Sequence, residues 1–154
     1  VFTGLSGTIT LSSTPLQPLN QQTTIDGTTA AGYVSGAPTI IIDGTVTGNI
    51  FNFSNISDNS ILQGLTIKAQ STGSNYTISV ATSADNITIR DMIFDSSTFT
   101  NGGGGIFAGV AVNLNILNNK FIGVEPQIWK WIAKKKYTNI LNSSIVQKKN
   151  LYCM

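Results

Sequence analysis

The sequence contains no histidine and only one cysteine, Cys153, among its 154 residues. The absence of histidine excludes every catalytic triad, metal site and proton relay that needs an imidazole. A single cysteine cannot form a disulfide within the chain or build a thiolate zinc site. Charged residues make up only 10% of the chain, against roughly 25% in an average globular domain. Most familiar catalytic chemistry is therefore excluded.

Long apolar stretches are also missing, since no run approaches the roughly 20 residues that a membrane-spanning helix needs. At 41% hydrophobic residues, the chain is instead expected to fold as one soluble domain with no membrane span. Residues 1–123 are rich in Thr, Ser, Asn, Gly and Ile, which favours short β-strands separated by tight turns over helices.

Glycine and charge are unevenly distributed. All 15 glycines lie in residues 1–123, where six aspartates outnumber three basic residues. Residues 124–154 contain no glycine, both tryptophans, and six lysines against one glutamate. The change predicts two segments, a β-rich segment 1–123 and a basic, Trp- and Lys-rich tail 124–154. The net negative charge of the first segment disfavours binding of nucleic acid.

A repeat with a period of 27 residues runs through the β-rich segment. Twenty-seven residues accommodate two or three short strands and their turns, about one coil of a β-solenoid, in which equivalent positions stack roughly 4.8 Å apart. The upstream apolar residues Phe53, Val80 and Phe107 show the same spacing. The repeated units are 59–67, 86–94 and 113–121.

A bend is expected inside each repeat. Ile87 and Ile89 alternate with Thr88, but the next apolar residues, Met92 and Phe94, are out of phase with them by one residue. A straight strand cannot bury all four of these side chains, whereas a bend between them restores the phase. The bend position is occupied by the residue types that best tolerate a left-handed backbone, namely Gly64, Asp91 and Asn118.

Each unit also begins with asparagine, which predicts a column of turn residues whose side chains bond to neighbouring coils. These residues are Asn59, Asn86 and Asn113. We further expect two interior columns, Ile61 with Ile87 and Leu114, and Ile67 with Phe94 and Phe121. The positions expected to face outward carry little charge: Ser60, Gln63, Thr66, Thr88, Arg90, Ile93, Asn115, Leu117 and Lys120.

Several stretches of the chain resemble, in the same order, a family of right-handed parallel β-helix repeat proteins of bacterial surfaces. They are Gly7–Leu11, Thr24–Thr28 followed by Gly32-Tyr33, Pro38–Gly44 and Asn118–Gly123. The resemblance covers about residues 4–123 and implies an all-β, pectate-lyase-like, single-stranded right-handed coil. It also implies export to the cell surface or the extracellular space, within a longer adhesin-like chain. It implies no activity, because the fold hosts both lyases and inert stalks.

The tail departs from the family pattern, which normally continues with further coils. Pro126 is placed as a first-turn residue, and Ile128, Trp131, Ile132 and Lys135 follow helical spacing, which predicts a short helix over 126–137. Three interpretations remain open. The tail is a cap on the open end of the solenoid, a sequence foreign to the domain, or a basic helix that binds a membrane surface or a partner.

Catalysis on a β-helix usually relies on carboxylates, often with a metal ion, or on a basic side chain. Arg90 and Asp91 are the catalytic candidates, and Asp85, Asp91 and Asp95 are the candidate ligands of a calcium ion. We favour a structural interpretation, in which Asp85 and Asp91 are turn residues and Arg90 is an exposed strand residue. The glycine run 102–105 lacks the residues of a phosphate or calcium loop and is interpreted as a flexible turn.

Two functions are compatible with these features. The first is a non-enzymatic β-helix segment of a secreted or cell-surface protein, acting as a stalk or adhesin-like surface that contacts carbohydrate or another surface protein without a cofactor. The alternative is a fragment of a polysaccharide lyase or glycoside hydrolase, with calcium as its cofactor. An enzyme should gather several carboxylates or bases on one face across successive coils. The neutral outward positions favour the first function.

Overall fold

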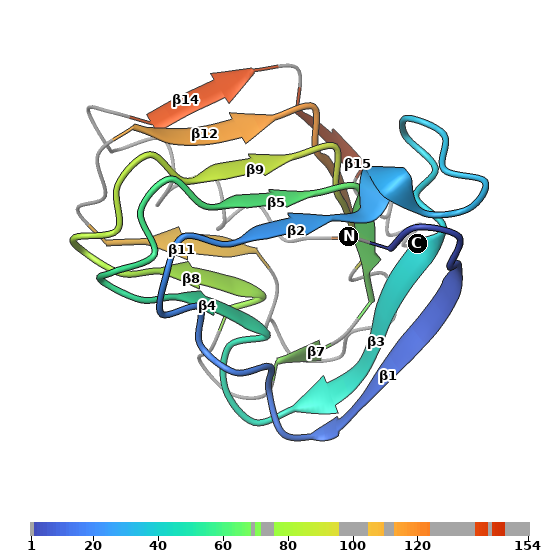
Figure 1. The fold of residues 1–154 in the computed structure, drawn as a ribbon, viewed down its shortest axis with the longest axis horizontal. Helices are drawn as coiled ribbons and strands as arrows, with labels where there is room; N and C mark the ends of the chain where they lie inside the picture. Colours follow the sequence, from blue (N-terminus) through green and yellow to red (C-terminus); the bar gives the residue numbers. More distant parts are fainter. Residues whose placement is uncertain are drawn as a thin grey trace, which may run out of the picture.

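The chain winds into stacked coils built from fifteen short strands among the described residues (Figure 1). The computed structural model describes residues 2–68, 70–71, 76–95, 105–109, 113–123, 138–141 and 143–146. The strands belong to three sheets, and within each sheet the neighbouring strands come from neighbouring coils. All pairings between these strands are parallel.

The three sheets have the following composition. The first sheet is ordered β1 (Gly7–Ser13), β3 (Ile40–Val46), β6 (Leu65–Ile67), β10 (Ile93–Asp95), β13 (Lys120–Ile122) and β15 (Ser144–Val146), with β7 (Gln70–Ser71) pairing to β3. The second sheet contains β4 (Phe51–Phe53), β8 (Ile78–Val80) and β11 (Ile106–Ala108). The third sheet contains β2 (Thr24–Asp26), β5 (Ile61–Gln63), β9 (Thr88–Arg90), β12 (Leu114–Leu117) and β14 (Thr138–Leu141). A short 3-10 helix, η1 (Gly27–Thr29), follows β2.

This arrangement confirms the predicted parallel β-helix. The core is the interior of the coil, where apolar side chains stack in columns along the axis. Phe94 pairs in register with Ile67 on one side and with Phe121 on the other, as the repeat predicts. All three are at most 3% exposed, and the rings of Phe94 and Phe121 stack with centroids 4.7 Å apart. A second column, on the third sheet, consists of Leu62, Ile89 and Ile116, each no more than 1% exposed.

The other predicted column is wrong by one residue. Ile61 pairs with Thr88, which lies on the outer side of the coil, and not with Ile87. The residue stacked with Ile87 and Leu114 at the 27-residue spacing is Ser60, whose side chain is fully buried and donates a hydrogen bond to the carbonyl of Ser57. At this interior position the first of the three repeats has Ser60, a small polar residue whose hydroxyl is hydrogen-bonded. The prediction followed apolar residues only and therefore chose Ile61, one residue away.

A second offset occurs on the second sheet. Phe53 and Val80 pair at the predicted spacing, but Val80 pairs with Ala108. Phe107 therefore faces outward, where its ring stacks on Tyr76 with centroids 4.9 Å apart. The third sheet has returned to the 27-residue spacing at Thr88 and Asn115. The extra residue before β11 is thus compensated before β12.

Two strands lie beyond the change in composition at residue 124. Thr138–Leu141 pairs with β12, and Ser144–Val146 pairs with β13, both in parallel. The change in composition therefore does not mark the end of the parallel pairing. The helix predicted over 126–137 lies outside the described residues, as do residues 102–104 of the glycine run.

Across the part of the chain that the structure describes, no helix has the length and apolar character needed to cross a membrane.

The stacked column on the first sheet gives a test of the assigned facing. Phe94→Ala should lower the free energy of unfolding by about 3–5 kcal/mol, because it removes a buried ring and leaves a cavity between Ile67 and Phe121. Thr88→Ala, on the outer side of β9, should cost less than about 1 kcal/mol. Denaturant titration of both variants measures the difference, and equal losses would contradict the assignment of the two faces.

Candidate functional site

The corner between the third and the first sheet is where the chain changes phase in three successive coils. Gly64, Asp91 and Asn118 occupy it with φ angles of +69°, +54° and +54°, as the sequence predicts. The side-chain amide of Asn118 donates to Oδ1 of Asp91 across the coils at 3.3 Å. The left-handed backbone conformation at position 91 is therefore the main constraint on which residue types can occupy it.

The predicted asparagine column lies at the corner that precedes the third sheet. Asn59, Asn86 and Asn113 have φ angles of +60°, +56° and +58°. Nδ2 of Asn113 donates to Oδ1 of Asn86 at 2.9 Å, which links two coils. Both corners of the third sheet thus carry a left-handed residue in each of these coils.

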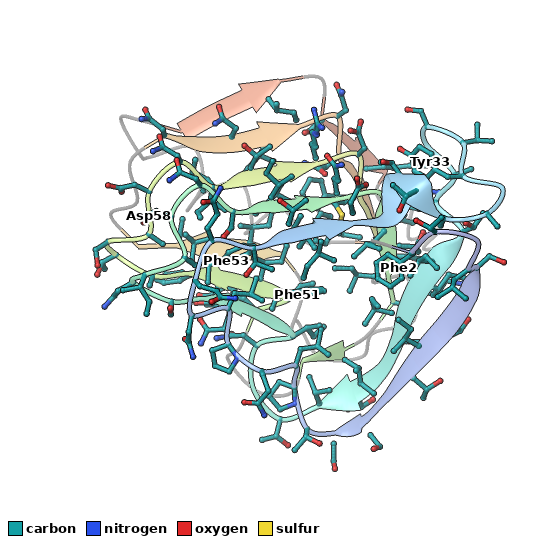
Figure 2. The ribbon with its side chains drawn as sticks, in the orientation of Figure 1. Phe2, Tyr33, Phe51, Phe53 and Asp58 are labelled. Atoms are coloured by element: carbon teal, nitrogen blue, oxygen red, sulfur yellow. The ribbon has the colours of Figure 1, made fainter. Side chains whose placement is uncertain are left out.

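A loop beside the first of these corners extends outward from the coil (Figure 1). Thr24 and Ile61 are paired although they are 37 residues apart, ten more than in the later coils. The extra residues form the connection from η1 to β3, which contains a tight turn closed by the bond from the Ala37 amide to the Val34 carbonyl. Figure 2 places Tyr33 on this loop, next to η1.

We call the polar surface beside this loop the corner face. Asp26, Gln63 and Arg90 are in register on three successive strands of the third sheet. Nε of Arg90 donates to Oε1 of Gln63 at 2.6 Å and lies 3.8 Å from Oδ2 of Asp91. The Arg90 side chain remains 45% exposed. The corner face consists of Asp26, Tyr33, Gln63, Arg90, Asp91 and Asn118.

Three positions expected to face the outside of the coil are buried, which corrects that prediction. Ser60 is fully buried, Gln63 is 6% exposed and Thr66 is 7% exposed. The Gln63 side chain carries the hydrogen bond from Arg90, so its polar atoms are shielded without being left unsatisfied. The outer surface is therefore more closely packed here than the neutral composition of these positions predicts.

The electrostatics of the corner face favour an ionised Asp26. Burial, the largest single effect, raises the pKa of the Asp26 carboxyl. Hydrogen bonds from the hydroxyl of Thr28, the side chain of Gln63 and the amide of Thr28 together outweigh burial, so the pKa lies below its usual value.

Tyr33 experiences the opposite effect. Burial, followed by the negative charge of Asp91, raises the pKa of the Tyr33 phenol, and the nearby Asp26 adds to this. A hydrogen bond with Ser35 and the charge of Arg90 oppose the rise without cancelling it. The phenol therefore stays neutral and can donate a hydrogen bond at physiological pH.

The three candidate calcium ligands lie on different segments of the coil. Asp85 follows β8, and its backbone amide donates to Oδ1 of Asp58 at 2.8 Å. Asp91 lies at the corner, and Asp95 ends β10. Within the described ranges, no group of three or more acidic, cysteine or histidine side chains is placed to hold a metal ion. Of the proposed catalytic pair, Arg90 and Asp91 are neighbours on the corner face.

Sequence reasoning missed Tyr33, Asp26 and Gln63 as members of one surface. A signal was present, because the pair Gly32 and Gly36 brackets Tyr33, and both glycines have positive φ angles. The contacts within the corner face join residues from different coils. Because the first coil is ten residues longer than the 27-residue repeat, that spacing does not align Asp26 with Gln63.

Comparison with models of known protein families, with curated proteins and with solved structures found no match for this chain.

The backbone role of Asp91 can be tested by two substitutions. Asp91→Asn should change the free energy of unfolding by less than about 1 kcal/mol, because Asn accepts the same φ and only an exposed ion pair is lost. Asp91→Val should cost at least about 1–2 kcal/mol more, since a β-branched residue is strained in the left-handed region. Urea titrations that rank the two variants in the opposite order would contradict a backbone role.

The lowered pKa of Asp26 predicts a pH dependence of stability. Below its usual pKa, the unfolded chain binds more protons than the folded chain, so the stabilisation is complete above about pH 4 and is lost as the pH falls through the lower folded-state value. Asp26→Asn keeps an acceptor for the Thr28 amide but removes the charge. Its stability should fall less steeply between neutral and acidic pH than that of the unchanged chain, as measured by thermal unfolding. Asp43→Asn controls for the loss of one exposed carboxylate, and identical profiles for Asp26→Asn and the unchanged chain would contradict the assignment.

Proposed function

We propose that this chain is a non-enzymatic β-helix segment of a secreted or cell-surface protein, an adhesin-like surface that binds carbohydrate at the corner face. The observation that carries the proposal is that Arg90 bonds to Gln63 and pairs with Asp91, on a surface whose charges act on the phenol of Tyr33. These groups are fixed by strands and corners that the stacking of the coils holds in place, so little order has to be gained when a ligand binds.

The state of the corner face supports binding over catalysis. A general acid needs a pKa near the working pH, whereas the pKa of Asp26 is lowered by its hydrogen bonds. Arg90 already uses Nε on Gln63, and Asp91 is positioned by its turn and paired with Arg90. Each group has a structural partner, which supports a role in presenting donors and acceptors.

The chemistry of the face suits a polyhydroxylated ligand. The guanidinium of Arg90 offers donors, the carboxylate of Asp91 offers acceptors, and the amide of Asn118 offers both. Adjacent hydroxyl groups of a saccharide require such neighbouring donors and acceptors, while Tyr33 supplies an aromatic ring with a polar tip. The exposed fractions of Arg90 and Asp91, 45% and 20%, leave both groups accessible to a ligand.

A glycan array probed with the labelled chain tests this function. We expect binding to a subset of neutral oligosaccharides, and a loss of about tenfold in affinity for Tyr33→Ala, as follows from removing a contact worth roughly 1–1.5 kcal/mol. Tyr76→Ala is the matched control, because Tyr76 stacks on Phe107 at the second sheet and not at the corner face. Equal effects of the two substitutions would place binding elsewhere.

The same preparation distinguishes the alternative functions. If no glycan binds to the chain but a surface protein binds to it in a way that depends on Tyr33, the corner face is a protein-binding surface. If calcium raises the melting temperature and the chain releases unsaturated products from a polyuronate, the lyase fragment replaces the adhesin-like function.

A further inference from the structure

Gln63 links the two charged ends of a row of polar side chains on the third sheet. Asp26, Gln63 and Arg90 are in register on β2, β5 and β9. Oε1 of Gln63 accepts from Nε of Arg90 at 2.6 Å, and the side-chain amide of Gln63 donates to the Asp26 carboxylate. Because a guanidinium only donates and a carboxylate only accepts, these neighbours determine which end of the Gln63 amide faces each of them. Gln63 is buried and therefore acts through these neighbours.

The bond to Gln63 determines which part of Arg90 is available to a ligand. Both contacts of the guanidinium, with Gln63 and with Oδ2 of Asp91, use Nε. Within the described residues, no hydrogen bond uses its two terminal nitrogens, and the side chain is 45% exposed. The terminal nitrogens thus form a planar fork of donors, which matches two neighbouring acceptor oxygens.

Two adjacent hydroxyl groups of a saccharide fit this arrangement. A hydroxyl group both accepts and donates hydrogen bonds, so the pair can accept from Arg90 and donate to Asp91 at the same time. An ionised carboxylate also offers two oxygens to Arg90, but it has no donor for Asp91. It would place a second negative charge beside Asp91, which is unfavourable.

The charges of the corner face are also unbalanced against anions. Two of its members, Asp26 and Asp91, are carboxylates, whereas Arg90 is its one guanidinium. The Tyr33 phenol reports the resulting field, because its ionised form would be an anion on this surface. Burial is the largest cause of its raised pKa, and Asp91 and Asp26 each raise that pKa by more than Arg90 lowers it. An acidic group of a ligand at this place meets the same repulsion.

We propose that the corner face selects neutral saccharides with two adjacent hydroxyl groups and rejects the corresponding uronic acids, and that Gln63 is the positioning residue that orients Arg90. This inference rests on the proposed function and names the class of saccharide that the same site binds. Arg90 and Asp91 recognise the hydroxyl pair, while the charges of Asp26 and Asp91 exclude acids.

Isothermal titration calorimetry with matched sugars tests the selection by charge. The probes are trisaccharides of galactose, glucose and mannose, and the corresponding uronic acid trisaccharides, which carry a carboxylate at C6. The neutral trisaccharide that binds should do so about tenfold more tightly than its uronic acid counterpart, and high salt should reduce this difference. A uronic acid trisaccharide that binds as tightly as its neutral counterpart would overturn the selection.

Asp26→Asn isolates one of the two negative charges, because Asn keeps an acceptor for Gln63. The ratio of the two affinities should shift toward the uronic acid by about three- to tenfold. Asp43→Asn is the matched control, since Asp43 is an exposed aspartate of β3 outside the corner face. Its ratio should equal that of the unchanged chain, and equal ratios for the two variants would contradict exclusion by Asp26.

A double-mutant cycle tests the positioning role of Gln63. Gln63→Met keeps the length of the side chain but removes both hydrogen bonds, and Arg90→Lys keeps the charge but removes the fork. Each should weaken binding of the neutral trisaccharide about tenfold. The double variant should bind no more weakly than Arg90→Lys alone, because Gln63 acts through Arg90. Losses that multiply in the double variant would show that Gln63 has a general structural role instead.

Deoxy analogues of the bound trisaccharide test the hydroxyl pair without any change to the protein. Removal of either of two adjacent hydroxyl groups should weaken binding about tenfold, and removal of the other hydroxyl groups should have a smaller effect. Dependence on one hydroxyl group alone, or equal dependence on all of them, would overturn recognition of a pair. If no trisaccharide binds, neutral or acidic, the carbohydrate-binding function itself is wrong, and this inference fails with it.

Discussion

In three successive coils, the residue at the corner between the third and the first sheet has a left-handed backbone conformation. The burial of apolar side chains on both sides of that corner depends on it. Ile89 and Phe94 can both reach the core only if the chain changes phase between them. Asp91 makes that change at φ +54°, with Gly64 and Asn118 at the equivalent places. The conformation is unfavourable by roughly 1–2 kcal/mol for most residues, so its recurrence limits the corner to Gly, Asp or Asn.

The polar surface outside the coil follows from the same constraint. A residue that turns the chain inward directs its own side chain outward, which places Asp91 and Asn118 next to each other on successive coils. Arg90 precedes the turn and reaches Gln63 one coil earlier. The corner face is thus assembled from residues whose positions the core has already determined, and the loop that carries Tyr33 adds to it.

The features that recur every 27 residues could be predicted from the sequence, whereas those found in a single coil could not. The coil, the two left-handed corners and the column of Ile67, Phe94 and Phe121 follow from a constant spacing that is visible in the residues. The errors at Ile61 and Phe107 arose where an apolar residue lies one place away from the true interior position. Gln63 and Asp26 were missed as site residues because their surroundings come from neighbouring coils, and the first coil is longer than the repeat.

The shift of register by one residue at β11 shows which insertions and deletions this β-helix can accommodate. One additional residue before β11 is removed again before β12, so the register is restored at the next left-handed corner. By contrast, the ten additional residues of the first coil leave β2 and β3 correctly paired because they bulge outward between strands. Codon insertions and deletions within a strand therefore need a second, nearby change to be tolerated, whereas those at the corner before β3 are accommodated singly. New surface loops can arise there without any alteration of the core.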